Sequence, residues 1–125
     1  MGRTPSILVR GIALVGLAAC SVEPERQTGW RPIEDPASFY VEAVGRKLVS
    51  GEDHIVFLND GRIAGFYDGA ALTGNWRWDD DRLCRTASIG ARRLYPDCQL
   101  VAVDGDRLRI VRENGAGSTV VYSIE

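Results

Sequence analysis

Residues 104–124 read DGDRLRIVRENGAGSTVVYSI, and they carry the clearest structural signal in the chain. Leu108 and Ile110 alternate with arginines, so they share one face of an extended segment. Val120 and Tyr122 alternate in the same way after the glycine-rich residues 114–117. Alternation with period two on both sides of a turn is typical of an antiparallel hairpin with one buried face.

The same pattern extends toward the N-terminus as far as Lys47. Short β-prone segments alternate with turn residues, among which Asp60-Gly61 is a strong hairpin signal. Strands are predicted at 54–58, 62–67, 73–79, 82–88, 98–103, 107–112 and 118–124, with turns at 68–72 and 79–81 and a loop at 89–97. A single-layer sheet of so many strands would leave its apolar face exposed to solvent. The predicted class is therefore all-β, either a small lipocalin-like antiparallel barrel or a sandwich.

A short helix should precede these strands. Asp35-Pro36 combines an N-cap residue with proline at the first helical position, and Gly45 would end the helix. The residues predicted to share one helical side are Phe39, Tyr40, Ala43 and Val44. Such a helix could close one end of the β-structure.

The N-terminus has the features of an export signal, with Arg3 and Arg10, an apolar run and small residues before Cys20. Leu17-Ala18-Ala19-Cys20 resembles the lipobox of bacterial lipoproteins, which implies that Cys20 is lipidated and becomes the first mature residue. The alternative is an uncut anchor, but the apolar run has about half of the roughly 20 residues that a spanning helix needs. The prediction is a signal peptide at 1–19, a flexible tether at 20–36 and one domain at 37–125.

Two residues in the predicted tether bear on location. Ser21 follows the cysteine, and in lipoproteins with such a lipobox serine at this place favours the outer over the inner membrane. Trp30 either packs back on the domain or sits at the lipid headgroups.

The charge of the mature chain limits its partners. Two of the 15 basic residues and none of the 17 acidic residues precede Cys20, so the remainder carries a formal charge of −4. This balance argues against nucleic acid as the main partner. The partners expected instead are the membrane, through the lipid anchor, and either a small apolar ligand or an envelope protein.

Cys84 and Cys98 remain once Cys20 is assigned to the lipid. Export would place them in an oxidising compartment, so we expect a disulfide worth about 3 kcal/mol. A metal or redox pair is the alternative. The spacing matches no Cys-x-x-Cys motif, and the single histidine, His54, cannot complete a zinc site. We expect no metal and no cofactor.

Several motifs follow one another in a fixed order along the chain. They are Val44-Gly45-Arg46-Lys47-Leu48, Asp60-Gly61-Arg62-Ile63-Ala64-Gly65, Thr73-Gly74-Asn75-Trp76-Arg77-Trp78, Leu83-Cys84-Arg85, Pro96-Asp97-Cys98-Gln99 and Gly115-Ala116-Gly117. In this order they resemble a family of small exported alphaproteobacterial proteins. The resemblance spans roughly residues 39–125 and implies one exported domain.

Proteins of that family often carry the name dihydrodipicolinate reductase. Such an enzyme needs a Rossmann domain with a phosphate-binding Gly-x-Gly-x-x-Gly after its first strand. Gly115-Ala116-Gly117 is the one candidate, and it lies too near the C-terminus for a βαβ unit to follow. We therefore interpret it as a hairpin turn and the name as a misassignment.

Trp76, Trp78 and Tyr67 are the candidate ligand-lining residues. The two tryptophans are two positions apart, so they point to one face of a strand. They either line a cavity, together with Tyr67, or fill the core of the barrel.

Charged side chains offer a second set of candidates. Arg85, Arg92 and Arg93, with Arg82 nearby, either contact anions or belong to a mixed solvated surface. His54 and the aspartates at 79–81 are expected to be solvated. No catalytic motif is evident, and an enzyme would require a buried Glu42 or Asp97 with a raised pKa.

The favoured function is therefore non-enzymatic. We expect a lipid-anchored envelope module that binds a small apolar ligand. A protein-interaction barrel resembling a protease inhibitor is the alternative, and an enzyme is the remote one.

Overall fold

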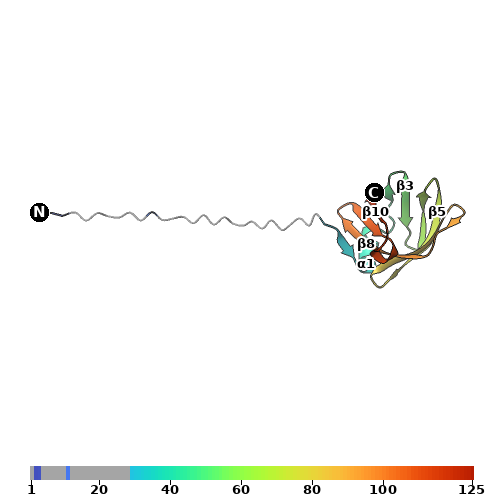
Figure 1. Ribbon diagram of the computed structural model, residues 1–125, viewed down its shortest axis with the longest axis horizontal. Coiled ribbons are helices and arrows are strands. Elements are labelled where there is room, and N and C mark those ends of the chain that lie inside the picture. Colours follow the sequence, from blue (N-terminus) through green and yellow to red (C-terminus); the bar gives the residue numbers. More distant parts are fainter. Residues whose placement is uncertain (1, 4–10, 12–28) are drawn as a thin grey trace.

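The computed structural model describes residues 2, 3, 11 and 29–125, so the predicted signal peptide, Cys20 and Ser21 lie outside the described residues. The described residues form an all-β, eight-strand antiparallel barrel with one short α-helix (Figure 1). This confirms the barrel and excludes the sandwich. The barrel strands are β2 (Leu48–Ser50), β3 (Asp53–Phe57), β4 (Arg62–Tyr67), β5 (Ala70–Asp79), β6 (Arg82–Ile89), β8 (Asp97–Asp104), β9 (Arg107–Val111) and β10 (Thr119–Ile124).

Pairing between β6 and β8 closes the barrel. Around the ring the order is β8-β9-β10-β2-β3-β4-β5-β6, and the β6–β8 contact joins its two ends. This closing contact is short, because it pairs only Leu83, Cys84 and Arg85 with residues of β8. Beyond it β6 pairs instead with β7 (Arg92–Arg93), a two-residue strand within the segment predicted to be a loop.

The hairpins follow the predicted turns, with local differences. The turns at 60–61, 79–81 and 104–106 connect β3 to β4, β5 to β6 and β8 to β9. Strand β5 begins at Ala70, within the predicted turn 68–72, so the actual turn is Asp68-Gly69. Two glycines permit close strand approach: a Cβ on Gly65 would meet the His54 carbonyl oxygen, and one on Gly74 would meet that of Thr86.

Helix α1 (Pro36–Glu42) fills one end of the barrel (Figure 1). The Asp35 carboxylate accepts a hydrogen bond from the Ser38 backbone N–H at 2.8 Å, and hydrogen bonds from Ser38 hold the pKa of Asp35 below its usual value. Phe39 has no exposed surface, whereas Tyr40, predicted on the same side, is 47% exposed. The helix ends at Glu42, before Gly45, because its C-cap Ala43 leaves helical geometry.

The domain includes residues that precede its predicted boundary. Arg31–Ile33, assigned to a flexible tether, forms strand β1 and pairs with Val101–Val103 of β8. Trp30 lies beside the guanidinium groups of Arg107 and Arg109, at 4.9 and 5.0 Å from its ring centre. The predicted boundary at 36 is therefore wrong, and of the two alternatives for Trp30 the packed one holds.

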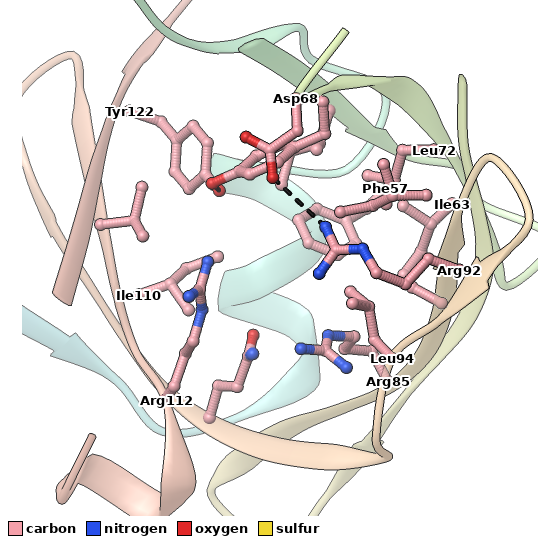
Figure 2. Close-up of a pocket in the computed structure, with 16 residues that line it drawn as sticks. Phe57, Ile63, Asp68, Leu72, Arg85, Arg92, Leu94, Ile110, Arg112 and Tyr122 are labelled. Atoms are coloured by element: carbon pink, nitrogen blue, oxygen red, sulfur yellow. Dashed lines mark hydrogen bonds and ion pairs between the residues drawn. The ribbon is translucent and has the colours of Figure 1, made fainter. Parts of the chain in front are cut away.

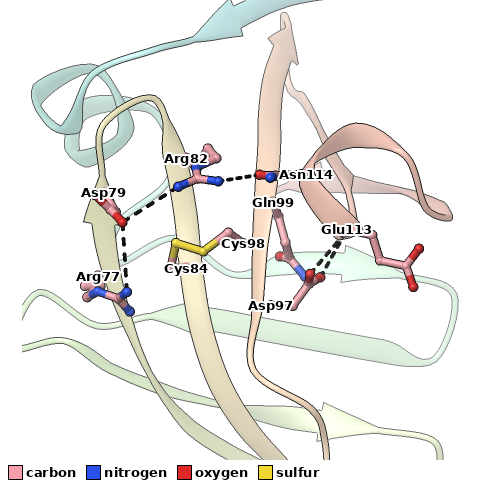
Figure 3. The surroundings of a disulfide bond; sticks show 9 residues. All are labelled: Arg77, Asp79, Arg82, Cys84, Asp97, Cys98, Gln99, Glu113 and Asn114. Carbon is pink, nitrogen blue, oxygen red and sulfur yellow. Dashed lines mark hydrogen bonds and ion pairs between the residues drawn. A yellow bond between two sulfur atoms is a disulfide. The ribbon is translucent and has the colours of Figure 1, made fainter.

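The predicted disulfide joins Cys84 to Cys98, which are cross-strand partners at the closing β6–β8 contact (Figure 3). Among the described residues, every strand, helix α1 and the disulfide lie between Arg31 and Ile124, so a chain of residues 21–125 contains all of them. None of the helices described is long and apolar enough to cross a membrane.

Candidate functional site

The barrel contains a cavity of about 210 Å³ (Figure 2). Its apolar wall is formed by inward-facing side chains of six strands, because alternate residues of each strand point to the barrel axis. These residues are Ile55, Phe57, Ile63, Leu72, Ala87, Ile89, Ile110 and Val120. The helix α1 lies behind the cavity in Figure 2.

Leu94 adds to the apolar wall, and polar side chains complete the lining. They come from β4, β6, β7, β8, β10 and the turns after β4 and β9. Figure 2 shows Arg112 beside Ile110 and Arg85 beside Leu94, so polar and apolar side chains are interspersed around the cavity. The polar lining residues are Tyr67, Asp68, Arg85, Arg92, Gln99, Arg112 and Tyr122. The site thus combines an apolar interior with hydrogen-bond donors and cationic groups, which is the usual composition of a small-molecule pocket.

Tyr67 and Tyr122 place two hydroxyl groups at the cavity, with their oxygens 3.5 Å apart. Burial raises the pKa of Tyr122 above its ordinary value, and the contact with Tyr67 raises it further. Tyr122 therefore stays a neutral hydroxyl at physiological pH and can donate or accept a hydrogen bond.

The structure brings only one of the three predicted ligand-lining residues to the cavity. Tyr67 lines it, whereas Trp76 and Trp78 belong to the filled end of the barrel. Both indoles pack on Phe39, with ring centres 5.3 and 5.2 Å away. Their Nε1 groups donate to the backbone oxygens of Leu58 and Asp80, each at 2.8 Å. The core interpretation of the tryptophans therefore fits their environment.

The predicted arginine cluster is divided. Arg85 and Arg92 line the cavity, whereas Arg93 lines a separate depression on the outside of the barrel. Arg82 lies elsewhere: it donates to the Asn114 side-chain oxygen at 2.7 Å and pairs with Asp79 (Figure 3). Of the two predicted alternatives, the mixed solvated surface fits Arg82 and Arg93. It does not fit Arg85, which lines the cavity.

Sequence reasoning missed Arg112 and Gln99. Arg112 continues the inward alternation of Leu108 and Ile110, so a signal for its position was present. Gln99 is 4% exposed and alternates with Val101 and Val103 on the inward face of β8.

The remaining candidates make ordinary structural contacts. His54 stacks on Phe66 at 6.5 Å between ring centres, and Glu42 pairs with Arg31 at 2.8 Å. The aspartates at 79–81 form the β5–β6 turn, and within the described residues no cluster of potential metal ligands occurs. Gly115 ends the short 3₁₀-helix η1 (Glu113–Gly115), which connects β9 to antiparallel β10, as the predicted hairpin turn requires.

The fold and the cavity define a small antiparallel β-barrel with an internal amphipathic pocket. Comparisons with protein-family models, with curated proteins and with solved structures found no match to the chain.

Proposed function

We propose that this protein is an exported, lipid-anchored envelope module that binds a small, largely apolar ligand inside its barrel. The observation that carries the proposal is the cavity of about 210 Å³ with its wall of isoleucine, leucine and phenylalanine side chains. A purely structural barrel of this size would fill such a space with side chains, as this one does at the end occupied by Phe39 and Trp76.

The cavity is large enough for a ligand of modest size. An apolar protein cavity of about 150 Å³ is sufficient for benzene, so this one suits a ring of that size or a short alkyl chain. Each methylene group moved from water to the apolar wall contributes roughly 0.8 kcal/mol to binding. Such a ligand would enter past the rim, where the side chains of Arg92 and Asp68 are about 60% exposed.

Native mass spectrometry of residues 21–125, exported to a periplasm and purified without detergent, tests the proposal. We expect a defined small-molecule adduct that is lost on unfolding, on a protein whose mass is two hydrogens below the reduced value because of the disulfide. A bare mass from gently handled protein, unchanged after incubation with an extract of envelope lipids, would contradict it.

The anchor is the second part of the proposal. We propose that Cys20 carries the lipid and that Ser21 favours the outer membrane, as the lipobox resemblance implies. The full chain should take up a labelled fatty acid and sediment with membranes, whereas Cys20→Ala should do neither. Equal labelling of the two proteins would refute the assignment.

A protein partner is the alternative function, and Tyr95 favours it. This side chain is 91% exposed on the segment between β7 and β8, and the backbone oxygen of the same residue accepts a hydrogen bond from Arg85 of β6. Exposed tyrosines are common anchors in protein interfaces. A bare mass in the experiment above would turn the search toward such a partner.

The family resemblance supports an exported domain without assigning an activity. We propose that the chain belongs with the small exported proteins that it resembles. The position of Gly115-Ala116-Gly117 between β9 and β10 supports leaving the reductase name aside.

A further inference from the structure

The cavity lining carries more positive than negative charge. Arg85, Arg92 and Arg112 contribute three cations, and Asp68 contributes the one carboxylate. Asp68 is already engaged, because it accepts a hydrogen bond from Arg92 at 3.4 Å. Neither Arg85 nor Arg112 forms an ion pair with any carboxylate among the described residues. Two guanidinium groups thus remain at the cavity without an anionic partner.

Arg85 occupies an inward position of its strand. Its side chain is on the same face of β6 as those of Leu83, Ala87 and Ile89, which belong to the core. One of its nitrogens, Nη1, donates to the Tyr95 backbone oxygen at 2.7 Å, which holds the side chain across the cavity wall. A guanidinium placed inside a barrel loses hydration, and a hydrogen-bonded anion offsets part of that loss.

Burial and a neighbouring cation both disfavour the positive charge of Arg85. Burial lowers the pKa of Arg85, Asp97 partly offsets this effect, and the nearby positive charge of Arg112 lowers the pKa further. Asp97 acts only from a distance, since its oxygens accept from the Gln99 side-chain amide at 2.9 Å and the Glu113 backbone N–H at 3.1 Å (Figure 3). Arginine keeps its proton in proteins, so Arg85 and Arg112 both stay positively charged. An anion in the cavity would reduce the repulsion between these two charges.

We propose that the ligand is a single-chain amphiphile whose carboxylate or phosphate head is bound by Arg85 and Arg112, with its short apolar tail against Ile55, Phe57 and Ile63. Figure 2 shows the guanidinium groups on the side of the cavity opposite Tyr122 and Asp68. Their planar forks match the oxygens of either head group. This inference rests on the proposed function and specifies the class of ligand.

A matched set of eight-carbon probes tests the proposal. Octanoate, octyl phosphate, 1-octanol and octylammonium are titrated into residues 21–125 at low ionic strength, and binding is followed by methyl NMR and by calorimetry. Charge-assisted hydrogen bonds to the head group should make at least one of the two anions bind about ten-fold or more tightly than 1-octanol. Which anion binds more tightly distinguishes a carboxylate ligand from a phosphate one. Octylammonium should bind most weakly.

Two variants locate the effect. Arg112→Gln should remove most of the advantage of the anion over 1-octanol. Arg85→Gln should do the same, while circular dichroism verifies that loss of the Tyr95 hydrogen bond has not unfolded the barrel. Arg93→Gln is the control, because Arg93 lies on the outside of the barrel. It should leave every affinity within about two-fold of wild type.

The outcomes separate this inference from the proposed function. If 1-octanol binds as tightly as both anions, or if Arg93→Gln removes the advantage as fully as Arg112→Gln does, the head-group assignment is wrong and the apolar cavity site survives. If none of the four probes binds, both proposals fail.

Discussion

Replacing Phe39 with alanine should lower the free energy of unfolding by about 3–5 kcal/mol. Phe39 is fully buried, and its ring contacts those of Phe57, Trp76 and Trp78 at 5.2–5.4 Å between centres. The variant therefore loses both apolar burial and three aromatic contacts, and the neighbouring indoles are too constrained by their backbone hydrogen bonds to refill the space. Urea unfolding of residues 21–125 measures the change.

Val41→Ala is the matched control, because Val41 lies on the same helix and is 78% exposed. It should change the free energy of unfolding by less than about 0.5 kcal/mol. If Phe39→Ala lowered the free energy of unfolding by no more than the control does, below about 1 kcal/mol, α1 would not be a part of the core that closes the barrel.

The local parts of the fold could be predicted from the sequence. Alternation in residues 107–124 and turn residues such as Asp60-Gly61 specify hairpins, since each depends on a few neighbouring residues. The disulfide followed from the cysteine count once Cys20 was assigned elsewhere. The choice between barrel and sandwich was beyond such reasoning, because closure depends on the three-residue contact of β6 with β8 and not on any local pattern.

The start of the domain was missed for a related reason. Arg31-Pro32-Ile33 has two prolines nearby and no alternation long enough to indicate a strand, yet β8 supplies a partner along its second half. Proline is compatible with this outer strand, which pairs on one side only.

The candidate site was predicted in part. Tyr67, Arg85 and Arg92 reach the cavity, but tryptophans at alternate positions predict an inward face without saying at which end of the barrel they lie. Arg112 could have been placed by continuing the alternation of β9 by one step, and was obscured by the adjoining polar turn.

Filling the cavity should abolish ligand binding while preserving the barrel. Val120 lines the cavity and pairs with Ile110, whereas its neighbour Val121 faces outward and is 39% exposed. Val120→Trp would place an indole in the space that a ligand would occupy, at a packing cost of roughly 1–3 kcal/mol at most. Val121→Trp adds the same side chain to the opposite face of the same strand and serves as the control.

Titration of 1-octanol into the three proteins, followed by the methyl resonances of Ile55, Ile63 and Ile110, compares them directly, with thermal unfolding verifying that each is folded. We predict saturable shifts of these resonances in the wild type and in Val121→Trp, and none in a folded Val120→Trp. Shifts that persist in Val120→Trp, or that are absent from all three proteins, would contradict a ligand site inside the barrel.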